Sequence, residues 1–212
     1  MVMEFINGQN LTKIKPLFAK MNEKEKLKNV IRIFLILSNE LQKMHQSNFI
    51  HRDIKLENTM FFEKEDKLYF IFIDFGSSFK LSDKEEEKVY CISPPYSPPE
   101  QNTAEESFLS DVYSLGICFE KILDLIEIFD PPLSISSLVV KMREKQISER
   151  ISLEECKKIL INFVSDNFKE DSDFQGDYLK QKCITDNLEN LRNKITKKSV
   201  ALQIITTKFS II

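Results

Sequence analysis

The stretch that decides the fold is His51-Arg52-Asp53-Ile54-Lys55-Leu56-Glu57-Asn58, followed by Ile73-Asp74-Phe75-Gly76. It places a carboxylate, an ammonium group, an amide and a second carboxylate close together in the chain. Phosphoryl transfer requires phosphates, metal ions and an acceptor hydroxyl to be held in line while negative charge is neutralised. The residue types therefore predict phosphoryl-transfer chemistry.

Two short apolar runs flank these groups. Met60-Phe61-Phe62 begins just after Asn58, and Phe70-Ile71-Phe72-Ile73 ends at Asp74. Both runs are typical of short strands, which would bring the two polar side chains to one edge of a hairpin. The intervening polar residues 63–67 lack an Asn-Gly or Asp-Gly pair, so we expect a longer turn.

The two strings resemble the catalytic loop and the magnesium-binding loop of eukaryotic protein kinases, H-R-D-L-x-x-x-N and D-F-G. The resemblance implies that Asp53 accepts the proton of a substrate hydroxyl, and that Lys55 places positive charge near the transferring phosphoryl group. Asn58 and Asp74 would then hold Mg²⁺ through oxygen atoms. Each residue alone could be a turn residue or a solvated charge, but the spacing favours the functional interpretation.

The resemblance continues through the C-terminal lobe of a kinase. Tyr96-Ser97-Pro98-Pro99-Glu100 is similar to the A-P-E end of the activation segment, with proline in place of alanine. Asp111-Val112-Tyr113-Ser114-Leu115-Gly116 resembles the start of the buried helix that anchors the catalytic loop. Arg150-Ile151-Ser152-Leu153 resembles the motif whose arginine pairs with the A-P-E glutamate.

Three expectations follow from this likeness. Glu100 and Arg150 would form an ion pair with a structural role. Ser93 resembles the hydroxyl residue that contacts the catalytic aspartate and lysine, although a serine beside two prolines is also ordinary turn chemistry. Lys55 differs from the arginine-containing pattern of tyrosine kinases, which favours a serine/threonine-directed enzyme.

The first residues, 1–11, resemble the end of a strand followed by the hinge between the two kinase lobes. The family would then use ATP and Mg²⁺ here, with Met3 at the gatekeeper position. The nucleotide contacts that the resemblance implies are the Glu4 carbonyl and Ile6 amide at adenine, Asn10 near the ribose and Met60 against the ring. An apolar run at this place is also typical of an ordinary buried strand.

No G-x-G-x-x-G stretch occurs among the four glycines of the chain. We therefore expect most of the N-terminal lobe to be absent, leaving the nucleotide with a floor and no roof. Loss of charge stabilisation and water exclusion would make the isolated chain weak or inactive. Apolar surface exposed where that lobe would pack would favour a partner that covers it.

The interval from Asp111 to Arg150 spans only 39 positions (150 − 111) and is shorter than in a typical kinase. Apolar spacing predicts a helix from Asp111 to about Glu127, and residues 136–144 resemble the kinase helix just before the arginine, with Pro131-Pro132 as a breaker between them. The helix that ordinarily docks protein substrates and regulators would then be deleted.

Arg52 would, by the same resemblance, belong to a basic cluster that binds a phosphorylated residue. Val89 and Tyr90 stand where that residue would normally lie, and the acidic run 83–87 precedes them. One hypothesis is that the acidic run contacts Arg52 and replaces a phosphate. The alternative is a solvated, mobile acidic loop.

Helical spacing of apolar residues predicts a long core helix over Glu23 to Gln46 and a closing helix from Leu153 to about Asp166. The fold class is mainly α within the α+β family: a kinase-like C-lobe, a helical bundle with short β-hairpins. Residues 1–11 would be the residual strand and hinge, 12–168 the C-lobe, and 169–212 an extension of unknown role. Within that extension, 179–198 could form an amphipathic helix.

Composition limits the partners. The 212 residues are 42% hydrophobic and carry 30 basic and 33 acidic side chains, for a net charge of −3. This balance gives no strong electrostatic case for nucleic acid or membranes. The kinase resemblance implies that the partner is a protein substrate. No C-x-x-C pair occurs and the two histidines flank one helix end, so we expect reduced thiols, no such metal site and a cytoplasmic location.

Three functions of different classes remain open on the residues. The first is an ATP-dependent serine/threonine protein kinase domain, of which this chain is part. The second is a noncatalytic binding or scaffold protein built on a kinase C-lobe, and the third is a truncated, nonfunctional fragment. Retention of Asp53, Lys55, Asn58 and Asp74 together favours the first.

Overall fold

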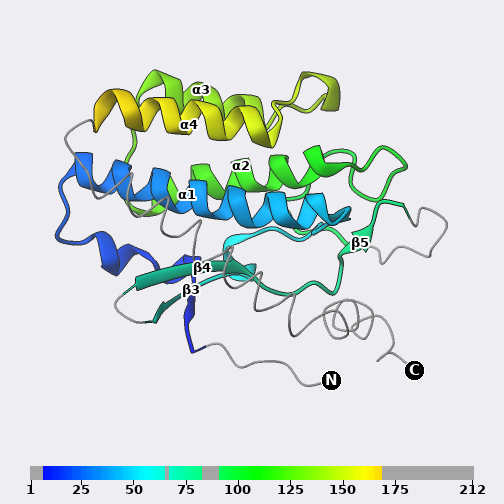
Figure 1. The fold of residues 1–212 in the computed structure, drawn as a ribbon, viewed down its shortest axis with the longest axis horizontal. Coiled ribbons are helices and arrows are strands. Elements are labelled where there is room, and N and C mark those ends of the chain that lie inside the picture. Colours follow the sequence, from blue (N-terminus) through cyan, green and yellow to red (C-terminus); the bar gives the residue numbers. More distant parts are fainter. Residues whose placement is uncertain (1–6, 65–66, 83–90, 169–212) are drawn as a thin grey trace. The chain divides into compact units, whose positions relative to one another are not determined.

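The computed structural model describes residues 7–64, 67–82 and 91–168 (Figure 1). Residues Ile6–Asp166 form one compact unit. Its helical part consists of α1 (Glu23–Gln46), α2 (Phe108–Leu125), α3 (Leu133–Met142) and α4 (Leu153–Asn167), as far as the described ranges reach. Two small sheets complete it, and none of the described helices is long and apolar enough to cross a membrane.

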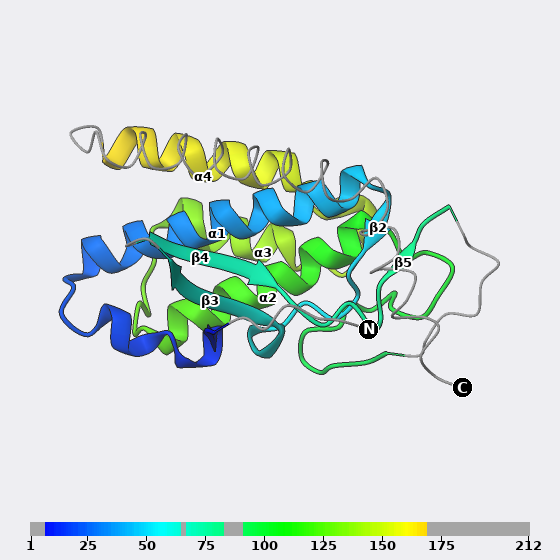
Figure 2. The same ribbon diagram turned by 60° about the horizontal axis from the view of Figure 1, so that its bottom comes forward.

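Helix α1 has the predicted bounds because its start is capped and one face is apolar. Asn22 accepts from the backbone N–H of Glu25, whose carboxylate accepts from the N–H of Asn22, which is a capping box. The rings of Phe34 in α1 and Phe119 in α2 stack with centroids 3.8 Å apart. Figure 2 shows the two helices side by side, with the hairpin across one side of the pair. The buried face of α1 comprises Val30, Ile31, Ile33, Phe34, Leu35, Leu37 and Leu41.

Helices α2 and α3 both begin three residues before the predicted positions. Ser107 caps α2 together with Ser110, which moves the start from Asp111 to Phe108. Pro132 is the N-cap of α3, so the helix starts at Leu133 and not at residue 136, because proline needs no N–H partner there. Residues 126–132 join the two helices without another helix, as the short interval predicted.

The larger sheet has the order β1-β3-β4, formed by Gln9–Asn10, Thr59–Lys64 and Lys67–Phe72. Strands β3 and β4 are antiparallel from Thr59↔Phe72 to Lys64↔Lys67. The predicted longer turn over residues 63–67 is therefore wrong, because strand pairing continues through Glu63, Lys64 and Lys67. Strands β2 (Phe49–Ile50) and β5 (Phe79–Lys80) pair antiparallel in a second sheet.

The predicted ion pair between Glu100 and Arg150 is present and buried. Arg150 Nη1 donates to Glu100 Oε1 over 2.6 Å, and Nη2 donates to Oε2 over 3.1 Å. The two side chains are 4% and 0% exposed, respectively. Burial alone would raise the pKa of Glu100, but hydrogen bonds from Arg150 and Ser110 hold that pKa below its usual range. The pair joins Glu100 to the short segment that precedes α4.

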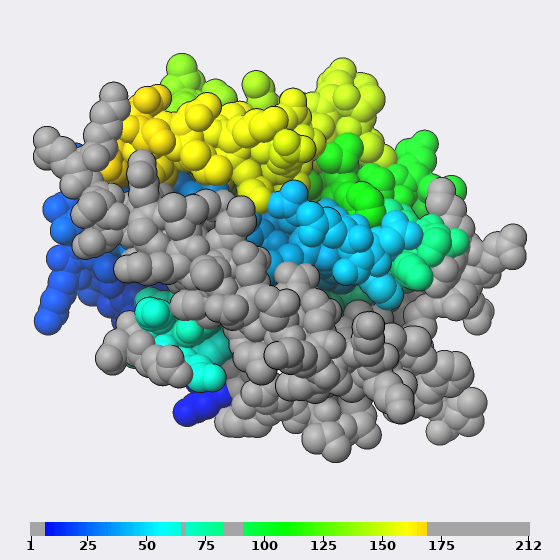
Figure 3. All heavy atoms as spheres, viewed as in Figure 1, coloured from blue at the N-terminus to red at the C-terminus, as the bar shows by residue number. Residues whose placement is uncertain are grey.

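Helix α4 lies along α1, and the two form adjoining surfaces in the space-filling view, yellow beside blue (Figure 3). Lys157 Nζ in α4 donates to Gln42 Oε1 in α1 over 2.5 Å. The most exposed large apolar side chains in the described ranges are Phe129 and Leu133, at 78% and 81%. Both lie in or next to the short connection between α2 and α3.

Candidate active site

The loop at His51 and Arg52 is held by a buried carboxylate from the first turn of α2. Asp111 Oδ2 and Oδ1 accept from the backbone N–H groups of His51 and Arg52, each over 2.9 Å. His45 Nε2 lies 2.9 Å from the same Oδ2. Burial would raise the pKa of Asp111, yet the His45 contact and the neighbouring His51 hold it below its usual range. Arg52 has a φ of 69°, so the fixed loop also holds a left-handed residue.

Three predicted residues, Lys55, Asn58 and Ser93, donate hydrogen bonds to the Asp53 carboxylate. Lys55 Nζ donates to Asp53 Oδ2 over 2.8 Å, and Asn58 Nδ2 donates to the same oxygen over 2.7 Å. Ser93 Oγ donates to Asp53 Oδ1 over 2.7 Å, and Lys55 Nζ reaches Ser93 Oγ over 3.2 Å. The structure thus brings together side chains from the catalytic loop and the activation segment, and the contacts predicted for Ser93 are present.

This cluster keeps both charges in place. Burial alone would raise the pKa of Asp53, but hydrogen bonds from Lys55, Ser93 and Asn58 lower it. Burial alone would lower the pKa of Lys55, but its bond to Asp53 and the negative charge there raise it. The pKa of Asp53 is lowered and that of Lys55 is raised, so both shifts favour the charged form, and a carboxylate and an ammonium group stand side by side near neutral pH. A carboxylate in this state can accept a hydrogen bond from a substrate hydroxyl.

Asp74 and Asn58 lie at the same end of the hairpin, as predicted. Asn58 directly precedes β3 and Asp74 follows β4, and the Ile73 N–H donates to the Asn58 carbonyl over 2.9 Å. Asp74 has a φ of 61°, and its Oδ1 accepts from the Gly76 N–H over 3.3 Å. The Asp74 side chain is exposed, while Asn58 is buried with its amide nitrogen on Asp53.

The donor set fits Mg²⁺ bound together with phosphates. In the described ranges no three side chains from His, Cys, Asp and Glu gather as a metal cage. Mg²⁺ in phosphoryl-transfer sites commonly takes one or two protein oxygen ligands, substrate phosphates and water. One amide oxygen on Asn58 and one exposed carboxylate on Asp74 match that requirement.

A pocket of about 270 Å³ lies beside these ligands, next to β1 and the start of β3. It contains Asn10 and Met60, two of the predicted nucleotide contacts; Glu4, Ile6 and Met3 lie outside the described residues. The pocket volume is just below the ~300–1,000 Å³ of typical ligand pockets, as we expect where the described residues form only one face of a binding site. Lys13 and Glu57, which were not predicted for this role, also border the pocket. The full lining is Gly8, Gln9, Asn10, Lys13, Glu57, Met60 and Ile73.

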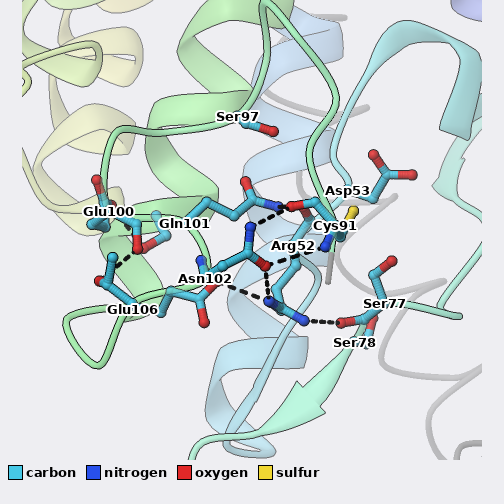
Figure 4. A network of polar contacts seen from close by, with 12 residues as sticks. Arg52, Asp53, Ser77, Ser78, Cys91, Ser97, Glu100, Gln101, Asn102 and Glu106 are labelled. Carbon is cyan, nitrogen blue, oxygen red and sulfur yellow. Dashed lines mark hydrogen bonds and ion pairs between the residues drawn. The ribbon is translucent and has the colours of Figure 1, made fainter. Parts of the chain in front are cut away.

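The contacts of Arg52 were not predicted. Its guanidinium group contacts Glu106, Asn102 and the Ser77 carbonyl, as Figure 4 shows. The acidic run 83–87, expected to contact Arg52, lies outside the described residues. The sequence did offer a signal for Glu106, because this residue lies shortly before Asp111, whose carboxylate binds the same loop.

Comparison with known proteins agrees with this geometry. A family model described as protein kinase domain matches residues 1–198. Serine/threonine-protein kinase KIN4 of Saccharomyces cerevisiae is 31% identical over 119 residues, covering 55% of this chain and 14% of that protein. Serine/threonine-protein kinase shk2 of Schizosaccharomyces pombe is 33% identical over 135 residues, covering 62% and 20%.

A probable serine/threonine-protein kinase PLK of Dictyostelium discoideum is 37% identical over 100 residues, 46% of this chain and 9% of that protein. The chain thus spans between 9% and 20% of the length of these three relatives. The family match covers well over half of the chain and includes every residue of the cluster around Asp53. The chain therefore belongs to the protein kinase domain family.

Proposed function

We propose that this chain is part of a serine/threonine protein kinase domain that transfers a phosphoryl group from ATP to a protein hydroxyl. The observation that carries the proposal is the cluster in which Asp53 is bound by Lys55, Asn58 and Ser93. It holds a cation, an amide and a hydroxyl within hydrogen-bonding distance of one ionised carboxylate. Orientation and charge stabilisation are what this reaction asks of a protein.

The residues would divide the work by position. Asp53 would orient the acceptor hydroxyl and take its proton, while Lys55 would stabilise negative charge on the transferring group. Asn58 and Asp74 would hold Mg²⁺, which when bound neutralises phosphate charge. Asn10 and Met60 would contact the ribose and the adenine ring from the pocket beside them. Glu4 and Ile6 complete the proposed nucleotide contacts from the sequence pattern.

Specificity for serine or threonine is supported by Lys55 in the catalytic loop and by the relatives, which are named as serine/threonine-protein kinases. The substrate would be a protein. A partner covering the surface that faces the N-terminal lobe, and a cytoplasmic location, are further parts of the proposal. The free state of Cys91, Cys118 and Cys156 supports an intracellular protein.

A second candidate is a noncatalytic binding protein on the same fold. The small pocket favours this candidate, because a volume of about 270 Å³ would cover only one face of a nucleotide. The 212-residue chain also contains no glycine-rich phosphate loop. On this reading the cluster around Asp53 would be retained without turnover, and the chain alone would bind nucleotide weakly or not at all.

Calorimetry of ATP binding to the full chain, with and without Mg²⁺, tests the proposal. We expect saturable binding that needs Mg²⁺ and is lost in Asp74→Ala. Asp130→Ala is the matched control, because Asp130 is an exposed aspartate outside the cluster and should leave binding unchanged. Binding would then be followed by transfer of labelled phosphate to a general protein substrate, with Asp53→Asn as the inactive variant.

The outcomes separate the two candidates. Binding lost in Asp74→Ala together with transfer lost in Asp53→Asn supports a kinase. Magnesium-dependent binding without transfer supports the noncatalytic protein. Absence of any binding, with the Asp130→Ala chain folded and equally silent, refutes a nucleotide site in this chain.

A further inference from the structure

Arg52 carries its positive charge inside the fold, surrounded by groups from two other segments (Figure 4). Its Nε donates to Glu106 Oε1 over 3.0 Å, and Nη2 donates to Asn102 Oδ1 over 2.8 Å. Nη1 donates to the carbonyl oxygen of Ser77 over 3.3 Å. The side chains of Arg52 and Glu106 are each 1% exposed. The Arg52–Glu106 contact is therefore a buried, charge-assisted hydrogen bond.

The segment that carries Glu106 also binds backbone groups on both sides of the site. Gln101 Nε2 donates to the carbonyl oxygens of Arg52 and Cys91, each over 2.8 Å. Asn102 Nδ2 donates to the Cys91 carbonyl over 2.9 Å, and Asn102 Oδ1 accepts from the Cys91 N–H over 3.2 Å. Glu106 Oε1 accepts from the Asn102 N–H over 2.9 Å. Residues 101–106 thus join the backbone at Arg52 to the backbone at Cys91.

The carboxylate of Glu106 lies on Arg52 Nε and so already supplies an anion to this buried positive charge. A buried guanidinium group without an anion is strongly unfavourable, so the fold must supply or recruit one. A phosphate directed at Arg52 would have to displace Glu106 or approach a second negative charge, which is repulsive. With Glu106 present, the charge of Arg52 is balanced by a residue of the fold itself.

We propose that Glu106 is the built-in counter-anion of Arg52 and a positioning residue for Asp53, so that the catalytic loop needs no phosphorylated residue in the activation segment to hold its geometry. The link to Asp53 is direct along the chain, because Asp53 follows Arg52. The geometric part of this inference stands on the contacts above. Its meaning for catalysis rests on the proposed kinase function.

Small-anion rescue of a truncated side chain tests the proposal. Glu106→Ala removes a group of the size of acetate, so acetate can refill the space and restore the charge, while acetamide refills it without charge. The readout is amide hydrogen exchange of peptides covering residues 51–58 in the full chain. We expect exchange at least about tenfold faster in Glu106→Ala, a factor equivalent to ~1.4 kcal/mol of local stability. Acetate, and not acetamide, should slow it again.

Controls separate charge from packing. Glu105→Ala changes the exposed neighbouring glutamate and should leave exchange at residues 51–58 unchanged, with no effect of acetate. Glu106→Gln keeps the shape but not the charge, and should resemble Glu106→Ala. If Glu106→Ala does not fold on expression, its refolding yield in acetate against acetamide becomes the readout. Equal yields in the two would overturn the proposal.

Phosphate dependence provides the second arm. Exchange at residues 51–58 of the natural sequence should be the same before and after treatment with a protein phosphatase. Faster exchange after that treatment, or unaltered exchange in Glu106→Gln, would overturn the proposal that Glu106 is the counter-anion of Arg52. If the chain does not bind ATP but the acetate-specific rescue is observed, the proposed function is refuted and this inference still stands.

Discussion

Gly116 in α2 lies so close to α3 that a Cβ at position 116 would come within 2.7 Å of Met142 Cβ. Arg143 Cγ would lie 3.2 Å from the same added atom. Real Cβ atoms do not approach a neighbouring Cβ this closely, so the two helices can pack here only because position 116 has no side chain. The close packing of α2 against α3 therefore depends on one glycine.

Gly116→Ala should destabilise the fold, although alanine favours a helix by about 1 kcal/mol over glycine. Forcing the helices apart typically costs about 1–3 kcal/mol, and the helix backbone cannot move as a flexible side chain would. We expect a net loss in the free energy of unfolding, measured with urea, that grows from alanine to valine. Ser134→Ala at an exposed position of α3 is the control. A more stable Gly116→Ala protein would mean that helix propensity outweighs the contact.

The buried pair of Glu100 and Arg150 should contribute far more than an exposed pair. Glu100→Gln or Arg150→Met alone should cost roughly 3–5 kcal/mol of unfolding free energy, because each leaves the partner charged and buried. The double variant should lose less than the sum of the two. The exposed pair of Lys158 and Glu154 is the matched control, expected to contribute below ~1 kcal/mol. Additive losses at Glu100 and Arg150 would contradict the coupling.

Acid should weaken the same pair in a defined direction. The pKa of Glu100 is held below its usual value in the folded protein, so the unfolded chain binds a proton first as the pH falls. The stabilisation is complete above the ordinary glutamate pKa and is lost as the pH falls through the lower folded value. The stability difference between the natural protein and Glu100→Gln should be constant near neutrality and shrink in acid. A difference that already shrinks near neutral pH would show a raised pKa.

Ser93→Ala should raise the pKa of Asp53, because one of the hydrogen bonds that lower it is removed. If the proposed reaction is present, the acid limb of its pH–rate profile should move to higher pH, while ATP binding is unchanged. Ser93→Thr keeps the hydroxyl and should restore the limb. Ser134→Ala, far from Asp53 in sequence and exposed, should leave the profile unaltered. An unmoved acid limb in Ser93→Ala would show that the hydroxyl does not tune Asp53.

Local patterns were sufficient wherever the physical cause is local. The bounds of α1 follow from a capping residue and a helical apolar period, and both are visible in neighbouring residues. The hairpin that brings Asn58 and Asp74 together follows from two apolar runs of strand length. The starts of α2 and α3 were missed by three residues because Ser107 and Pro132 act before the first apolar residue of each pattern.

The sequence by itself determined the protein kinase family, the groups around Asp53 and the Glu100–Arg150 pair, because these lie in motifs whose residue types and spacing have one chemical use. Only the tertiary structure decided which anion meets Arg52. From the sequence alone, many acidic side chains could pair with Arg52, because Coulomb attraction depends only on charge and distance and does not specify a position in the chain. Packing of residues 101–106 against the loop at Arg52 selects Glu106, because it buries the Glu106 carboxylate within hydrogen-bonding distance of Arg52 Nε.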